Sequence, residues 1–385
     1  MSALSSQPGQ APFCLPHTSE TADNDGFIGP TLPTFTELMD ECRGALHRRL
    51  GELLSVEQLC RNAGALIQSR TEAIVDVDEF RLPVVSLTIG NPDRAKSCLI
   101  LTAGVHGVER IGTQVLLAWL ESVVERCRWD AHWHMQFEED IAIVAIPLVN
   151  PGGMLMDSRC NPNGVDLNRH APIDAEDGAP FLLGGQRLWR KLPWYRGDWA
   201  NYIEPEFSAL QNIIYRYCRP GRLSVAIDFH SGFGLQDHIW IPFAYRKEPI
   251  DDIGNYTALK LLWERNFPHH NYSFGPQAMH YLSHGDMWDY FYLQCRDHGS
   301  RLLPLTLEMG SWLWVKKHPA QVFSFAGLFN PTVPHRHARV LRGHLILLDF
   351  FLAATRSSEQ WISEGERDRQ MAQVAQTLWY RNLEN

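Results

Sequence analysis

Short apolar runs and longer segments with helical periodicity alternate along most of the chain. The apolar runs have the length of strands, and they cover residues 83–90, 97–104, 141–150, 223–230, 238–243 and 302–310. Several are apolar at successive positions, which is typical of strands covered on both faces of a sheet. Helical segments lie between or after them, at 109–126, 205–218, 252–266 and 340–354. This order predicts an α/β fold in which helices cover both faces of a mostly parallel sheet.

Three segments depart from this alternation. Residues 1–30 are rich in Ser, Pro, Gly, Gln and Asp, and we expect them to form a poorly ordered arm. From about 31 to 75 an apolar spacing near 3.6 residues predicts a helical extension in front of the sheet. Residues 170–200 carry Pro, Gly and Trp without periodicity, which predicts a long loop of the kind that often serves function. No repeat or linker divides the rest, so the sequence predicts a single domain over 31–385.

Composition and charge exclude several classes of protein. The 385 residues are 45% hydrophobic and 21% charged, which is ordinary for a globular protein with a sizeable core. A net charge of −9 argues against a nucleic-acid surface, because phosphate binding needs clustered Lys and Arg. The chain lacks an apolar run long enough to span a membrane, and its first residues do not resemble a secretory signal, so we expect a cytoplasmic protein. Eight cysteines without a CxxC pair are expected to be reduced and mostly buried.

Histidines and a glutamate stand where predicted strands end. His106 and Glu109 follow the second apolar run at the start of a helix, so one imidazole and one carboxylate can reach the same cation. His230 ends the fourth run, with Asp228 two residues earlier on the same face. Each of these residues alone is more often structural than a metal ligand. Together, two histidines and one glutamate at strand ends favour a catalytic zinc site, with one ion per chain.

Other polar residues could supply the remaining chemistry. Glu308 ends the last apolar run, and a carboxylate at such a position could act as a general base beside an activated water. Arg159 could stabilise a developing oxyanion. Asn168 and Arg169 offer several donors to a carboxylate. The sequence leaves open that Arg169 only braces its loop through Asp166.

In their order along the chain, these motifs resemble the zinc carboxypeptidase superfamily. The matching segments span about residues 80–350 and read HGVE, NPGG, GVDLNRH, DFHSG and LEMG. The superfamily includes digestive-type carboxypeptidases, peptidoglycan-peptide amidases, and the succinylglutamate desuccinylase and aspartoacylase branch. The motifs HGVE and VDLNR are closer to those of the bacterial branch, whose substrates are small. The resemblance implies a three-layer α/β/α sandwich around a mixed, mostly parallel eight-stranded sheet.

The resemblance also implies roles for individual residues. It implies that zinc is bound by His106, Glu109 and His230, that Glu308 is the general base, that Arg159 polarises the oxyanion, and that Asn168 and Arg169 clamp the terminal carboxylate. Tyr281 is the candidate for a mobile tyrosine that closes over the substrate, with Tyr290 as the alternative. The position that selects the terminal side chain falls near Asp286, whose charge could favour an amine-bearing residue.

We therefore expect a zinc-dependent hydrolase of an amide bond next to a free carboxylate. A metallocarboxypeptidase acting on small peptides is the first interpretation, because Asn168, Arg169 and Tyr281 would all serve recognition of a terminal carboxylate. An N-acyl amino-acid deacylase similar to succinylglutamate desuccinylase or aspartoacylase is the alternative, and a catalytically silent metal-binding protein is a third. The expected partner is a small peptide or acyl amino acid, and neither nucleic acid nor membrane.

Overall fold

A computed structural model describes residues 32–46, 49–232 and 234–381. Residues Pro33–Asn385 form one compact unit. The arm expected at residues 1–30 lies outside the described residues. The cysteines of the described part are free and most are buried, as predicted.

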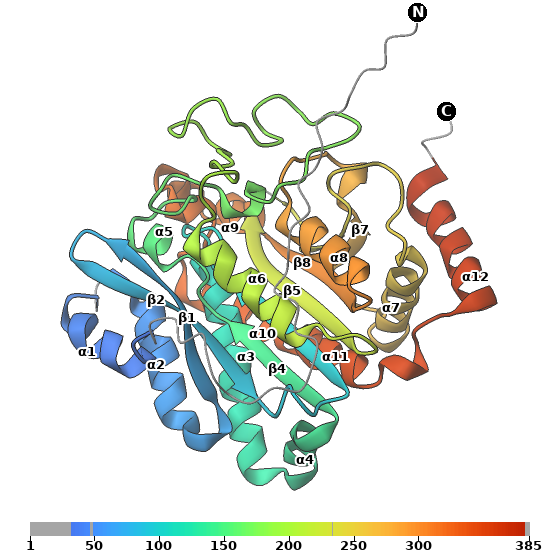
Figure 1. The fold of residues 1–385 in the computed structure, drawn as a ribbon, viewed down its shortest axis with the longest axis horizontal. Coiled ribbons are helices and arrows are strands. Elements are labelled where there is room, and N and C mark those ends of the chain that lie inside the picture. The colour runs from blue at the N-terminus through green and yellow to red at the C-terminus, as the bar shows by residue number, and fades with distance from the viewer. Residues whose placement is uncertain (1–31, 47–48, 233, 382–385) are drawn as a thin grey trace, which may run out of the picture. The chain divides into compact units, whose positions relative to one another are not determined.

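The described residues contain an eight-stranded mixed sheet, as the family resemblance implies (Figure 1). Its strands are β1 (Gln68–Val77), β2 (Phe80–Ile89), β3 (Ser97–Ala103), β4 (Ile141–Ile146), β5 (Leu223–Gly232), β6 (His238–Ile241), β7 (Ser273–Pro276) and β8 (Arg301–Gly310). They lie in the order β1-β2-β4-β3-β5-β8-β6-β7. The central strands β4, β3, β5 and β8 are parallel. Because the carboxyl ends of parallel strands meet at one edge, this arrangement brings the polar strand-end residues together.

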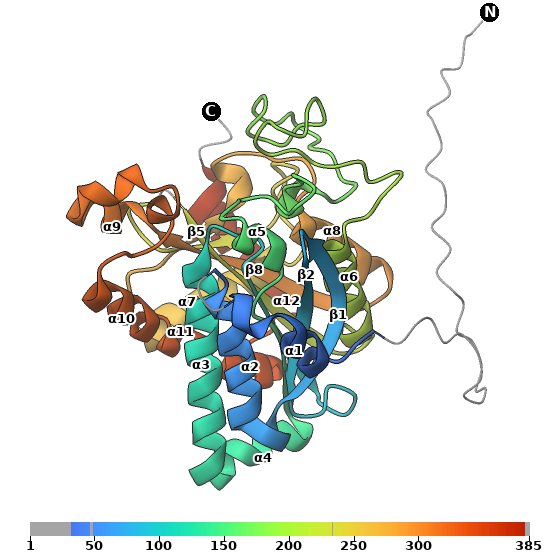
Figure 2. The same ribbon diagram turned by 90° about the vertical axis from the view of Figure 1, so that its left-hand side faces the viewer.

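Helices cover both faces of the sheet. They are α1 (Phe35–Leu46), α2 (Gly51–Ala63), α3 (Arg110–Trp129), α4 (Ala131–Glu139), α5 (Pro151–Leu155), α6 (Pro205–Tyr217), α7 (Ile253–Asn266), α8 (Met287–Asp297), α9 (Trp312–Lys317), α10 (Pro334–Gly343), α11 (Leu345–Arg356) and α12 (Gly365–Ala375). Figure 2 shows α3 and α10 on one side of the sheet and α6 and α8 on the other. Every residue of β3 and β4 is buried between these layers, which explains why their sequences do not alternate. Among the described helices, none has both the length and the apolarity needed to cross a membrane.

Two of the sequence-based boundaries were wrong. The helical extension expected to about residue 75 ends with α2 and a short 3-10 turn, and Gln68–Val77 is instead the strand β1. Among the described strands, β1 pairs only with β2, at the edge of the sheet. Part of β1 is exposed, and its polar residues obscure the apolar pattern of a strand. The helix expected at 340–354 is two helices, because the α10 helix ends at Gly343 and α11 begins at Leu345.

Candidate metal centre and active site

The structure brings His106, Glu109 and His230 together, with one ligand atom of each within 4.8 Å of the others. His106 and Glu109 lie in the turn between β3 and α3, and His230 lies near the end of β5. The turn depends on Gly107, since a Cβ there would lie within 3.0 Å of the backbone of Gly153. All three ligand side chains are buried.

Carboxylates outside this set orient both histidines. Asp166 Oδ1 accepts a hydrogen bond from His106 Nε2 at 3.1 Å, and Asp228 Oδ2 accepts one from His230 Nε2 at 2.8 Å. Both Nδ1 atoms therefore face inward, 3.1 Å apart, with the Glu109 carboxylate 2.8 Å from one and 3.0 Å from the other. Histidines that bind a metal usually give their other N–H to such a carboxylate.

This donor set fits zinc. Three lone-pair donors repel one another at these distances unless a proton or a cation lies among them. Burial lowers the pKa of His230, but the carboxylates of Asp228 and Glu109 outweigh burial and raise it well above the usual value. Burial likewise raises the pKa of Glu109, but His106 and His230 outweigh it and hold the pKa below its usual range. A dication would supply the positive charge that these carboxylates favour, and two nitrogens with one oxygen are a ligand set that zinc accepts.

Glu308 lies directly beside the metal ligands. Strands β5 and β8 are parallel neighbours, and their register pairs His230 with Glu308. Gly232 leaves room for the carboxylate, because a Cβ at that position would lie within 3.0 Å of Glu308 Oε1. Burial and the nearby charge of Glu109 raise the pKa of Glu308 to about 7. A carboxylate with that pKa can both accept and return a proton near neutral pH.

Asp166 joins Arg159 to the metal centre. Its Oδ2 accepts from Arg159 Nε at 2.9 Å, while Oδ1 accepts from His106. Arg159 Nη1 lies 3.6 Å from Glu109 Oε1. The sequence left open that Arg169 braces its loop through Asp166. The structure shows the Asp166 carboxylate bonded to His106, Arg159 and the backbone N–H of Asn168. Nothing in the sequence signals the bonds to His106 and Arg159, which are 60 and 7 residues away.

Asn168 and Arg169 lie in a 3-10 turn at Leu167–Arg169. Arg169 is 3% exposed, and its Nη1 donates to the backbone oxygen of Asn168 at 3.0 Å. Its Nε is buried without a hydrogen-bond partner among the described residues, and so is the side-chain oxygen of Asn168. Buried polar groups normally have hydrogen-bond partners, so these two unpaired atoms are suited to bind a polar ligand.

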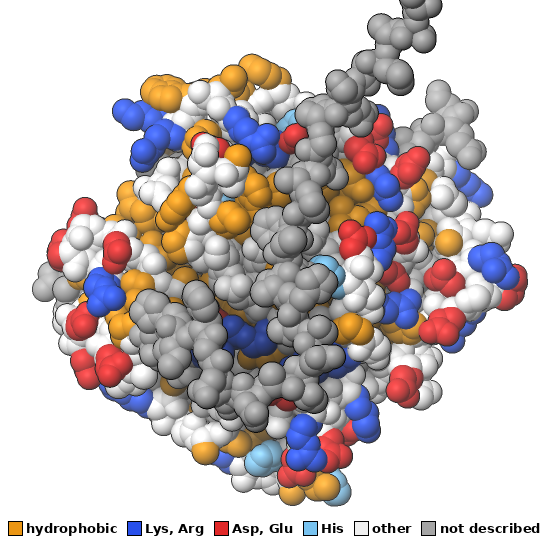
Figure 3. All heavy atoms as spheres, viewed as in Figure 1, with side chains coloured by type: hydrophobic (Ala, Val, Ile, Leu, Met, Phe, Trp, Pro, Cys, Tyr) orange, Lys and Arg blue, Asp and Glu red, His pale blue; other side chains and the backbone are white. Residues whose placement is uncertain are grey.

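The long loop predicted at 170–200 is present and holds this turn in place. Arg196 donates from Nε to the backbone oxygen of Arg169 at 3.1 Å and from Nη2 to that of Ile173 at 2.8 Å, and it pairs with Asp174. The loop also exchanges backbone hydrogen bonds with residues 284–285. Figure 3 shows hydrophobic side chains at the top of the view. Within the loop, the exposed large hydrophobic residues include Phe181, Leu183, Leu188 and Trp189.

The two candidate tyrosines differ in their surroundings. Tyr281 is 42% exposed, on the loop that leads from β7 to α8. Tyr290 is on α8 and packs against Trp199 and Phe207, and its hydroxyl receives a hydrogen bond from Gln211. The ring of Tyr290 is therefore held by packing and a hydrogen bond, whereas Tyr281 lies exposed on its loop.

The first turn of α8 also contacts the site. Asp286 caps the helix by accepting from the backbone N–H groups of Trp288 and Asp289. Trp288 Nε1 in turn donates to Asp228 Oδ2 at 2.9 Å, next to His230. Burial raises the pKa of Asp286, although the nearby charge of Arg169 opposes the rise. Sequence reasoning found Asp286 but missed Trp288, which no motif indicated.

Several solved structures are similar to this chain. Thrombin-activatable fibrinolysis inhibitor has a similar structure, with a TM-score of 0.59 and 17% identity over 78% of this chain and 72% of that one. The bovine form in complex with tick carboxypeptidase inhibitor aligns with a TM-score of 0.51 and 17% identity, over 78% and 97%. Carboxypeptidase A from Helicoverpa armigera aligns with a TM-score of 0.51 and 16% identity, over 66% and 61%. At such identities these likenesses show the fold.

No curated protein sequence matches the chain. Residues 82–312, more than half of the chain, match the family described as zinc carboxypeptidases. That segment contains His106, Glu109, His230 and Glu308. The chain therefore belongs to the zinc carboxypeptidase family and is a zinc metallopeptidase.

Proposed function

We propose that this protein is a metallocarboxypeptidase that holds one zinc ion and removes the C-terminal residue from small peptides. The observation that carries the proposal is the buried set of His106, Glu109 and His230 with Glu308 paired to His230 on the next strand. A ligand set and a carboxylate base in this arrangement suit hydrolysis of an amide bond.

The residues around the ligands have different roles in hydrolysis. Zinc, when bound, supplies a Lewis acid that polarises the scissile carbonyl and lowers the pKa of water. Glu308 takes the proton from the attacking water and returns it to the leaving amine. Arg159, held by Asp166, directs guanidinium N–H groups at the negative charge that develops on the carbonyl oxygen. Asp166 and Asp228 keep the two histidines in the tautomer that leaves Nδ1 free.

Arg169 is the proposed anchor for the free carboxylate of the substrate. Its buried, unpaired Nε is a charged donor, and a carboxylate is the natural acceptor for a guanidinium. Asn168 lies beside it, and Tyr281 stands exposed on the adjoining loop, where it could close over the bound residue. We further propose that Asp286 contributes negative charge near this anchor and favours an amine-bearing terminal residue.

A panel of substrates tests this function directly. Purified protein would be assayed with free-acid peptides, the same peptides amidated at the C-terminus, γ-linked peptides and N-acyl amino acids, before and after zinc removal. We expect zinc-dependent release of the terminal residue from free-acid peptides and almost none from amidated ones. Preferential cleavage of acyl amino acids would replace the peptidase proposal with the deacylase. Zinc binding without hydrolysis of any substrate would leave only a metal-binding protein.

A further inference from the structure

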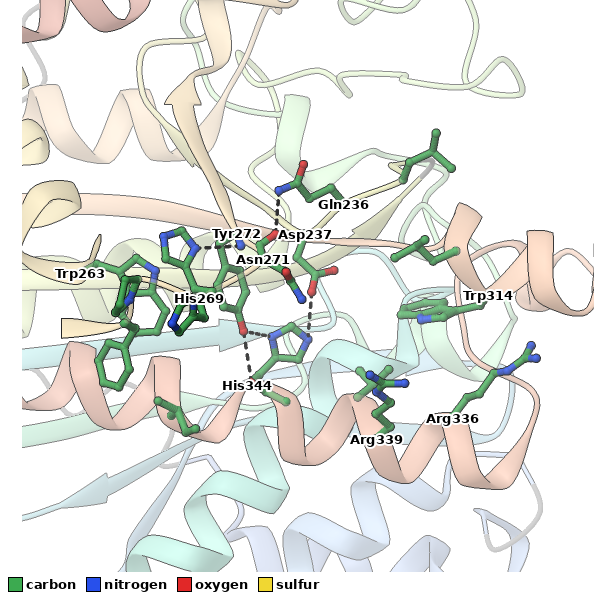
Figure 4. A pocket seen from close by; sticks show the side chains of 18 of the residues that line it. Gln236, Asp237, Trp263, His269, Asn271, Tyr272, Trp314, Arg336, Arg339 and His344 are labelled. Carbon is green, nitrogen blue, oxygen red and sulfur yellow. Dashed lines mark hydrogen bonds and ion pairs between the residues drawn. The ribbon is translucent and has the colours of Figure 1, made fainter. Parts of the chain in front are cut away.

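A cavity of about 1060 Å³ lies between the end of α7, the helices α9 and α10, and the loop before β6. The residues that line it include none of the metal ligands, nor Glu308, Arg159 or Arg169. Figure 4 shows the cavity with Arg336 and Arg339 rising from α10 below it and Trp314 above them. The volume is at the upper end of what small-molecule sites usually have.

The charges around this cavity are opposite in sign to those of the chain. Lys317, Arg336 and Arg339 line it, whereas the whole chain has a net charge of −9. Among the described lining residues Asp237 is the one acid. Its Oδ1 accepts from the backbone N–H of Gly310 at 3.0 Å, and its Oδ2 lies 4.0 Å from His344 Nε2. Three cations stand against this one carboxylate, so the lining carries a net positive charge.

One guanidinium in the lining has a nitrogen atom without a hydrogen-bond acceptor in the described part of the chain. Arg336 Nη2 donates to the backbone oxygen of Lys317 at 3.2 Å, but Arg336 Nη1 is buried without a hydrogen-bond partner among the described residues. An unpaired guanidinium nitrogen removed from water is costly unless an acceptor reaches it. Burial lowers the pKa of His270 and of His344, so these two histidines are neutral at neutral pH and the charge rests on Lys and Arg.

The rest of the wall is aromatic. Trp263 packs against Phe267 with ring centroids 4.4 Å apart and against Tyr272 at 5.8 Å. Tyr272 is held by a hydrogen bond of 2.8 Å between its hydroxyl and His344 Nδ1. Trp314, on α9, is buried and lies near Arg336 and Arg339, at the other end of the view from Trp263 (Figure 4). Rigid rings next to cations suit a ligand with an apolar body and a negative head.

We propose that this cavity binds an amphipathic organic anion, with its acidic group against Arg336 and Arg339 and its apolar body against Trp314 and the Trp263 cluster. The site is separate from the metal centre, and the proposal does not depend on the peptidase function. The shared chemistry is a carboxylate or similar anion on an aliphatic or aromatic body.

Two fluorescent dyes with the same apolar body test this site. Anilinonaphthalene sulfonate carries a negative charge, and phenylnaphthylamine is its neutral counterpart; both brighten in apolar surroundings. We expect the anionic dye to bind at about one per chain, and Arg336→Gln with Arg339→Gln to weaken it about tenfold while the neutral dye is little affected. Arg342→Gln is the matched control, because Arg342 is exposed on the same helix and is not among the residues that line the cavity.

Competition and a second variant complete the test. Decanoate or naphthoate should displace the dyes better than decanol or naphthol, and whichever acid is stronger identifies the body as aliphatic or aromatic. If the double variant unfolds on heating well below wild type, the exposed Arg339→Gln alone serves, with a smaller loss expected. The proposal is overturned if the arginine variants bind the anionic dye as wild type does, if both dyes weaken equally, or if the alcohols compete as well as the acids.

Discussion

Replacing Asp166 with asparagine would show whether the metal ligand and the neighbouring arginine depend on one buried carboxylate. Asp166 accepts from His106 Nε2 at 3.1 Å through one oxygen and from Arg159 Nε at 2.9 Å through the other. Asparagine has a single side-chain oxygen, so one of these partners must face its NH₂ group. If that partner is His106, Nε2 becomes an acceptor and the ring proton moves to Nδ1, where the metal needs a lone pair.

The loss of zinc affinity or of kcat depends on which of the two partners loses its bond to the side-chain oxygen. Removing the carboxylate partner of a metal-binding histidine weakens metal affinity by roughly 10–100-fold, or about 1.4–2.7 kcal/mol. If the asparagine oxygen stays with His106 instead, zinc affinity changes little, and the freed Arg159 lowers kcat at saturating zinc. Either arrangement lowers kcat/KM, and the two are separated by measuring zinc affinity and kcat on the same protein.

Competition with a chromophoric zinc chelator measures the affinity. Asp157→Asn is the control, because Asp157 is an exposed carboxylate that bonds Arg110 at 2.9 Å and does not contact the ligands. We expect its zinc affinity to stay within about twofold of wild type, as for surface charges. An Asp166→Asn protein with wild-type zinc affinity and wild-type kcat would refute the role of this carboxylate.

Further changes test the other parts of the site. His230→Ala should lose most of the bound zinc by metal analysis, and full occupancy would remove His230 from the ligand set. Glu308→Gln should keep its zinc and lose at least ~10²-fold in kcat, because an amide cannot accept the proton; near-normal turnover would contradict its role as base. Gly232→Ala should lower kcat at unchanged zinc content, since the new methyl group meets Glu308 Oε1, and an unchanged rate would show that the carboxylate is not needed there. Arg169→Ala should raise KM for free-acid peptides, and an equal loss on amidated peptides would make Arg169 purely structural.

The sequence predicted the parts of the site that depend on strand ends. His106, His230 and Glu308 follow apolar runs, and parallel pairing of those strands is enough to bring them to one edge. Arg196 could not be predicted in the same way, because its hold on the backbone of Arg169 spans an irregular loop without periodicity. The same limit applies to β1, since an edge strand with polar residues on its open side has a weak pattern.

The pairing of β5 with β8 separates the spacing of the reacting groups from the binding of the substrate. Backbone hydrogen bonds fix the distance from His230 to Glu308, whereas Arg169 and Tyr281 stand on loops outside the sheet. We therefore expect that exchanging Arg169 or Tyr281 changes substrate binding without altering the spacing of His230 and Glu308. One inserted residue inside either strand would have the opposite effect, because it turns every following side chain to the other face. The length of these two strands is therefore the feature of the site that tolerates least change.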